Sequence, residues 1–147
     1  MKETPLLEHR NQLAAHGRKV LQICGIELKR TSELQRQICG AFLFGIVYAY
    51  GRTHKLGPPE IHALGITMLE DVLAYDAAQA GAFSSKLVAA SAAGSEDTMN
   101  AILHRGIDGH HQLEVDQEEN LRENLLGLFM QLNATYDPDD SSSNSKR

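Results

Sequence analysis

The stretch from Ile38 to Tyr50, ICGAFLFGIVYAY, constrains the fold more than any other part of the chain. Wound as a helix it has no polar face, and a helix of that kind is normally buried on all sides by its neighbours. It is shorter than the ~20 apolar residues that a membrane span requires. Gly40, Gly45 and Gly51, in it or directly after it, each lower helix stability by up to ~1 kcal/mol relative to alanine. Close approach of a crossing helix would compensate for that loss, so we predict that this helix runs through the centre of a bundle.

The remaining segments also have helical periodicity, and none alternates with the period of a strand. Ser32 with Gln35 and Asp76 with Gln79 have the spacing of helix caps, and Pro58 follows Gly57 as it would at the start of a helix. These signals predict an all-α fold, a single-domain compact bundle of about six helices, over residues 1–133. Residues 134–147, ATYDPDDSSSNSKR, are acidic and then Ser-rich, which predicts a disordered tail.

The composition is that of a globular protein, with 42% hydrophobic and 22% charged residues. A net charge of −5 argues against a nucleic-acid partner, because phosphate binding needs clustered Lys and Arg; an acidic surface suits a basic protein instead. The N-terminus lacks the pattern of a secretory signal, and no apolar run could span a membrane. We therefore expect a cytoplasmic protein without membrane association. Cys24 and Cys39 would be reduced there and would pack as neighbouring small hydrophobic residues.

Residues 104–112 read HRGIDGHHQ, an unusual concentration of histidine, charge and glycine. Gly106 can be the left-handed residue that ends a helix, with Ile107 packing back on Ile102 and with His104 and Arg105 in the last helical turn. Asp108 to His111 would then form a loop between two helices. Charged side chains on such loops often serve binding, so we expect a contact surface for a partner here.

No set of residues has the pattern of a catalytic site or of a metal site. His110 and His111 are adjacent and would point about 100° apart on a helix, by its ~3.6 residues per turn, and Glu60-x-His62 has the wrong spacing to share a helix face. Nucleophile-elbow and phosphate-loop motifs are missing. The acidic pairs Glu70–Asp71 and Glu118–Glu119 are typical of solvated helix faces. We expect neither an enzyme nor a bound cofactor or metal.

A resemblance to a protein family adds to this interpretation. The run GIVYAYGRTHKLGPPEIHALGITMLEDVLAYDAAQAGAF, followed by NAILHRGIDGH, resembles the small all-helical immunity proteins of bacterial polymorphic-toxin and contact-dependent competition systems. The shared features are the Gly/Ala-rich apolar helix ending in YAYG, the L-x-P-P-E helix opening and the HRG-x-D-G turn, within residues 40–112. The resemblance implies a non-enzymatic inhibitor in the cytoplasm that binds and neutralises one cognate toxin or effector domain. The expected partner-binding residues are Arg105, Asp108, His110, His111, Glu114, Asp116, Glu118 and Glu119.

Two other interpretations remain open from the sequence. One is a helical homo-oligomer, such as a homodimer, that holds a metal or small ligand through His54, His62, His104 or His110. The other is an adaptor or regulator of a secretion or phage system, which differs from an immunity protein only in its partner.

Overall fold

The computed structural model describes residues 3–90 and 98–134, and in these ranges the chain forms helices and no strands. The all-α prediction is confirmed. Six α-helices follow one another, with a short 3-10 helix, Leu28–Arg30, after the first. The α-helices are α1 (Glu3–Cys24), α2 (Glu33–Thr53), α3 (Pro58–Leu73), α4 (Ala77–Ala90), α5 (Thr98–Glu114) and α6 (Glu118–Gln131). None of the described helices is both long enough and apolar enough to cross a membrane.

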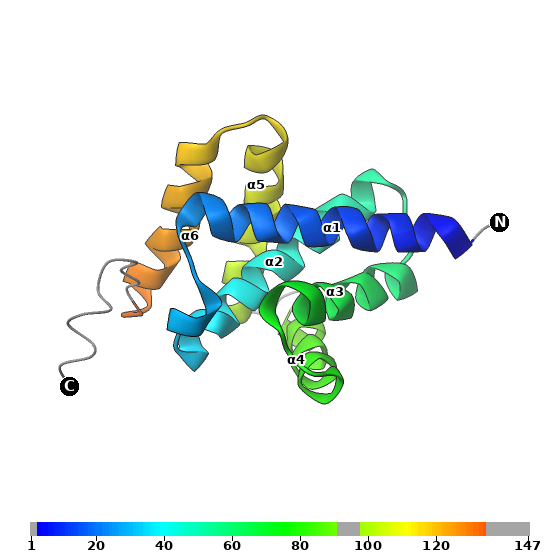
Figure 1. Ribbon diagram of the computed structural model, residues 1–147, viewed down its shortest axis with the longest axis horizontal. Helices are drawn as coiled ribbons and strands as arrows, with labels where there is room; N and C mark the ends of the chain where they lie inside the picture. Colours follow the sequence, from blue (N-terminus) through cyan, green and yellow to red (C-terminus); the bar gives the residue numbers. More distant parts are fainter. Residues whose placement is uncertain (1–2, 91–97, 135–147) are drawn as a thin grey trace.

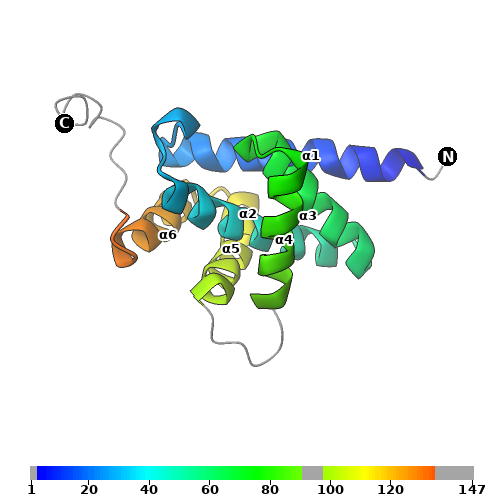
Figure 2. The same ribbon diagram turned by 90° about the horizontal axis from the view of Figure 1, so that it is seen from below.

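The apolar helix α2 lies at the centre of the bundle, as its sequence predicts. Every residue from Ile38 to Val47 is buried. Its main neighbours are α5 and α3, while α4 packs on α3 and α5, and α6 packs on α5 and α1. The helix α1 lies lengthwise across one side of the molecule, and it packs mainly on α3 and α6 (Figures 1 and 2).

The glycines of α2 are contact points for other helices, as predicted. A Cβ atom on Gly45 would lie 2.1 Å from the backbone oxygen of Leu103 in α5. At Gly40 it would meet the ring of Phe83 at 2.6 Å, and at Gly51 the side chain of Ile61 at 2.4 Å. Glycine therefore allows α5, α4 and α3 to approach the central helix more closely than any larger residue would.

The helix starts that the sequence predicts are also present. Ser32 and Gln35 form a reciprocal capping box at the start of α2, and Pro58 is the first residue of α3. The backbone N–H of Gln79 donates to Asp76 Oδ1 at 2.8 Å, and the Asp76 N–H donates to Gln79 Oε1 at 3.0 Å. In the sequence, Gly94 is also a signal for the end of the fourth helix and Ser95–Asp97 for the start of the fifth; these residues lie outside the described ranges.

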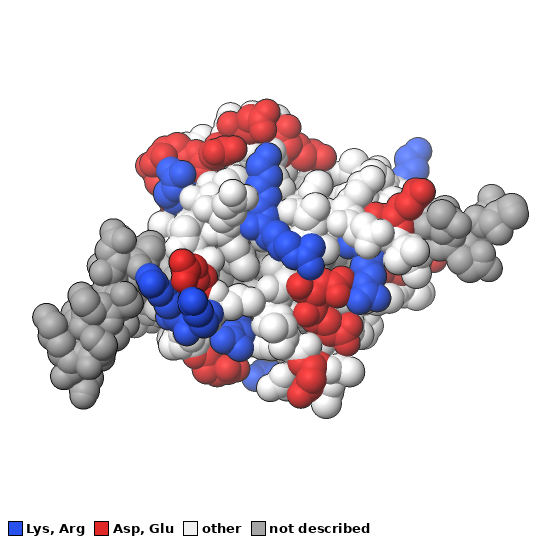
Figure 3. Space-filling view, in the orientation of Figure 1, with Lys and Arg blue, Asp and Glu red and all other residues white. Residues whose placement is uncertain are grey.

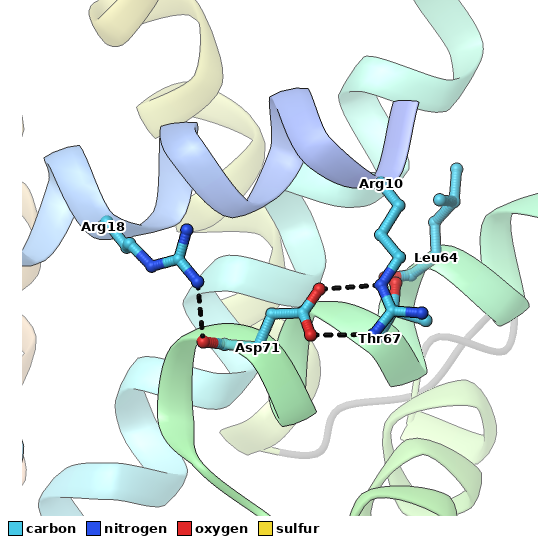
Figure 4. Close-up of polar contacts among 5 residues, drawn as sticks. All are labelled: Arg10, Arg18, Leu64, Thr67 and Asp71. Carbon is cyan, nitrogen blue, oxygen red and sulfur yellow. Dashed lines mark hydrogen bonds and ion pairs between the residues drawn. The ribbon is translucent and has the colours of Figure 1, made fainter. Parts of the chain in front are cut away.

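Asp71 does not belong to a solvated face, contrary to the prediction for the Glu70–Asp71 pair. Its carboxylate accepts two hydrogen bonds from the Arg10 guanidinium, at 2.9 and 2.8 Å, and its backbone oxygen accepts one from Arg18 at 3.2 Å (Figure 4). The Arg10 contact lowers the pKa of Asp71. Arg10 and Arg18 lie two turns apart on α1, so this one residue of α3 fastens a long section of α1 to the bundle (Figure 4).

The two cysteines are free and buried, as expected for core residues. Burial raises the pKa of both thiols to about 12, and at Cys39 the neighbouring Cys24 contributes to the rise. At the C-terminal side, Ala134 is buried, and its backbone oxygen accepts a hydrogen bond from Gln35 Nε2 at 2.9 Å. The predicted tail beyond it, residues 135–147, lies outside the described residues.

Candidate functional site

The segment HRGIDGHHQ is not a loop, and here the sequence-based prediction is wrong. It lies entirely within α5, which continues from Thr98 to Glu114 through both glycines. Gly106 does not end the helix: a Cβ on it would lie 2.0 Å from the backbone oxygen of Phe42 in α2. Gly109 packs in the same way against the Phe42 ring, where a Cβ would lie 2.6 Å from a ring carbon. Both glycines therefore mark a close helix crossing, and Gly45 of α2 lies against the same stretch of α5.

The helix stop lies further along, at Asp116. This residue has a left-handed backbone (φ 60), which aspartate tolerates better than most residues. The N–H of Gln117 donates to the Gln112 carbonyl at 2.9 Å, and the N–H of Asp116 donates to the Leu113 carbonyl at 3.3 Å. These two bonds are the Schellman pattern that the sequence predicts at Gly106. As a result Asp108, His110 and His111 are distributed around one helix instead of along a loop.

Arg105, one of the predicted partner-binding residues, is half-buried and joins α5 to α6. Its Nε donates to Asn124 Oδ1 at 2.6 Å and its Nη2 to the Asn124 backbone oxygen at 3.0 Å. Asn124 Nδ2 donates back to the Arg105 carbonyl at 3.0 Å and to Gln112 Oε1 at 3.1 Å. The sequence-based prediction does not include Asn124. Asn124 is a polar residue that shares the buried face of α6 with Leu121 and Leu125, and a polar residue on an apolar helix face is a signal that could have indicated a buried hydrogen bond. The bridge fixes how the two helices are spaced.

His110 is also part of the interior, with 4% of its surface exposed. Its Nε2 has no hydrogen-bond partner and lies 3.6 Å from a Glu114 carboxylate oxygen. Burial lowers the pKa of His110, while the Glu114 charge acts against this. His110 therefore lies beneath the exposed residues of α5.

A cluster of histidines surrounds Tyr50, at the end of α2, and the sequence does not indicate it. The Tyr50 hydroxyl donates to Gln12 Oε1 at 2.8 Å and lies 2.7 Å from His9 Nδ1, both on α1. The ring centroids of His54, His16 and His110 lie 4.1, 6.0 and 6.3 Å from that of Tyr50. Tyr50 and His54 are neighbours four residues apart at the end of α2, but His9, His16 and His110 come from α1 and α5, so the spacing in the sequence does not reveal the whole cluster.

The exposed members of the predicted surface lie at one end of the molecule. Six acidic residues of the C-terminal half of α5, the turn and the first two turns of α6 are exposed: Asp108, Glu114, Asp116, Glu118, Glu119 and Glu123. We call them the acidic end, and Figure 3 shows Asp and Glu gathered over the α5–α6 turn at the top of the molecule. Glu118 and Glu119 also stabilise the start of α6, where the helix dipole is positive. His111 is exposed within this surface.

A polar groove of about 330 Å³ runs between α5 and α6 within the acidic end. Asp108 and Glu123 lie on its two sides, with the Arg105–Asn124 bridge at its base and Asn120 and Gln112 completing the lining. Arg122 lies on α6 as well and is already engaged, because it pairs with Glu119 and donates from Nε to the Ile23 backbone oxygen at 2.9 Å. The groove is thus lined by two carboxylates, those of Asp108 and Glu123, and by one cation, Arg105.

The four histidines of the alternative metal site do not meet. In the described part of the chain, no three His, Cys, Asp or Glu side chains are placed to share a metal ion. His54 and His110 both flank the Tyr50 ring, whereas His62 lines a separate groove and His104 is exposed.

Comparison with known proteins places the chain in a family. Residues 10–132 match the family described as Immunity protein 48, which is most of the chain and includes all six helices in whole or in part. No curated protein and no solved structure matches the sequence significantly.

Proposed function

The chain belongs to the Immunity protein 48 family, and from this premise we propose that it binds and neutralises a cognate bacterial toxin domain through the acidic end. The inhibition is non-enzymatic, and it takes place in the cytoplasm of the cell that is protected. Family membership is the observation that carries this proposal, because immunity proteins as a class act against toxins. The acidic end supplies the contact surface.

The charge of the acidic end supports a basic partner. Its six carboxylates are exposed, and within this set only Glu119 and Glu114 lie within ion-pairing distance of a described basic group. Clustered charge of one sign raises the association rate with a partner of opposite sign, and this effect weakens as salt screens it. The groove between Asp108 and Glu123 adds a place where one Lys or Arg of the toxin can be held from two sides.

The predicted partner-binding residues divide into two groups in this proposal. Asp108, His111, Glu114, Asp116, Glu118 and Glu119 are exposed and contact the toxin. Arg105 and His110 are held inside the protein and position that surface through Asn124 and Tyr50. Replacing His110 would therefore test packing more than binding.

A rescue assay tests the function itself. The open reading frame next to this gene is expressed from a tight promoter in a sensitive bacterium, with and without this protein. We expect death in its absence and growth in its presence. Toxicity that persists with the protein present, or a harmless neighbour, would contradict the proposal.

Charge reversal tests the surface. In the double variant Asp108→Lys with Glu123→Lys, both carboxylates of the groove become basic, and we expect the Kd for the toxin to rise at least about tenfold and to depend less on salt. The matched control is Glu27→Lys with Glu33→Lys. This double variant changes the net charge by the same amount, but Glu27 lies between α1 and α2 and Glu33 at the start of α2. If both double variants bind alike, net charge and not the acidic end determines affinity.

A further inference from the structure

A second groove, apolar and separate from the acidic end, lies where α2, α3 and α4 meet. Its volume is about 550 Å³, and its apolar lining includes Phe44, Tyr48, Leu56, Ile61 and Val88. We call it the Tyr48 groove. A volume of this size is within the ~300–1,000 Å³ range of pockets that bind ligands or anchoring side chains.

At this groove, residues of the central helix α2 change from buried to exposed. Phe44 is 5% exposed, but Tyr48, one turn further along the same face of α2, is 38% exposed. Val88 on α4 is 44% exposed beside it. The remaining exposed large apolar residues, Leu34 among them, are not part of this groove. The lining of this groove therefore includes two apolar side chains that are each more than a third exposed.

The lining of the groove includes one permanent cation, Arg52. Arg52 lies one turn beyond Tyr48, with its guanidinium carbon 5.8 Å from the centre of the Tyr48 ring, and His62 lines the groove from α3. No carboxylate is among the lining residues, and within the described chain no acid forms an ion pair with Arg52. An occupant that combines an apolar group with a carboxylate would satisfy both parts of the groove.

We infer that the Tyr48 groove receives an apolar side chain of the toxin, presented on a segment that also carries a carboxylate for Arg52. This inference rests on the proposed function. Binding energy at interfaces is concentrated in apolar anchors that fill pockets, whereas exposed charges mainly set the association rate. The groove would therefore determine how long the complex lasts, and the acidic end how fast it forms. Nine residues line the groove, fewer than the about 20–30 residues a side of a complete interface, so the groove would be one anchoring point within a larger contact with the toxin.

Photo-crosslinking tests who occupies the groove. The full-length protein carries p-benzoylphenylalanine in place of Tyr48, or in place of Leu34 as a control on the same helix that is 46% exposed. We expect an adduct with the purified toxin from position 48 and none from position 34. Peptide mapping should place the adduct on an apolar residue within a few positions of an Asp or Glu. An adduct between two copies of this protein would overturn the inference.

Affinity measurements separate the groove from the function as a whole. We expect Arg52→Gln and Val88→Ser each to weaken toxin binding about tenfold, mainly by faster dissociation, while Lys86→Gln, an exposed cation elsewhere on α4, changes little. If the wild type binds and protects but both groove variants bind equally well, the groove assignment is wrong and the function stands. If the wild type neither binds nor protects, the proposed function is wrong and this inference falls with it.

Discussion

Replacing Gly106 by alanine tests the close crossing of α2 and α5. The new Cβ would lie 2.0 Å from the Phe42 backbone oxygen, 2.9 Å from its carbonyl carbon and 3.1 Å from its Cα. These atoms belong to the backbone of a buried helix, so no side chain can rotate away to make room. The two helices would have to separate, and Gly45 would lose its close approach to the Leu103 oxygen.

The expected loss follows from two opposing terms. Alanine is favoured over glycine inside a helix by about 1 kcal/mol. Overpacking of a core opposes this by typically 1–3 kcal/mol, occasionally more, and a backbone contact as short as this one belongs at the upper end or beyond. We expect Gly106→Ala to lower the free energy of unfolding by about 2 kcal/mol, which corresponds to a fall in Tm of roughly 4–8 °C for a domain of this size.

Urea unfolding of Gly106→Ala beside Gly81→Ala provides the measurement. Gly81 lies in α4 with nothing within 4 Å of its Cβ position, so alanine there should stabilise the protein by up to about 1 kcal/mol. Gly106→Asn adds a second distinction: asparagine is tolerated at a left-handed helix end, but at a helix crossing it should be worse than alanine. The reasoning is refuted if Gly106→Ala stabilises as Gly81→Ala does, or if asparagine is accepted there.

Three further predictions concern ionisable groups. Burial lowers the pKa of His110 in the folded state. Its contribution to stability is therefore complete above the pKa of the unfolded state, near 6.5, and is lost as the pH falls from there through the pKa of the folded state. His110→Gln should flatten this part of the curve of stability against pH, measured by urea unfolding. The thiols of Cys24 and Cys39, with pKa values of about 12, should not react with a disulfide reagent at pH 8 in the native protein but should react at once in denaturant, and rapid native labelling would contradict their burial. Asp71→Asn should lower the free energy of unfolding at pH 7 by about 1 kcal/mol, because it weakens the two-bond contact with Arg10. The pKa of Asp71 is lowered in the folded state, so this difference in stability should persist at pH 5. It should disappear only as the pH falls below the pKa of the unfolded state, near 3.9, and through that of the folded state. A difference that vanishes at pH 5 would contradict the prediction.

The predicted contact residues show where sequence reasoning reaches its limit. The sequence predicts Asp108 and His111 on a loop, and both are exposed, but they occupy a helix together with the buried His110. Adjacent residues on a helix face different directions. The surface that these residues form on α5 therefore differs from the surface that they would form on the predicted loop. The groove at Tyr48 has no counterpart in the sequence-based prediction, because a tyrosine in an apolar helix is indistinguishable from a core residue until its neighbours are placed.

The sequence by itself determined several helix starts and the burial of the central helix. Caps such as Ser32–Gln35 depend on residues three apart, and the apolar character of α2 requires burial whatever surrounds it. Only the tertiary structure decided whether Gly106 ends a helix or allows two helices to cross closely. Glycine is favoured both where the backbone turns left-handed and where another backbone comes too close for a Cβ, and the residue itself carries no mark of which applies. The position of Phe42, far away in the sequence, settles it, and with it the direction of every side chain that follows in α5.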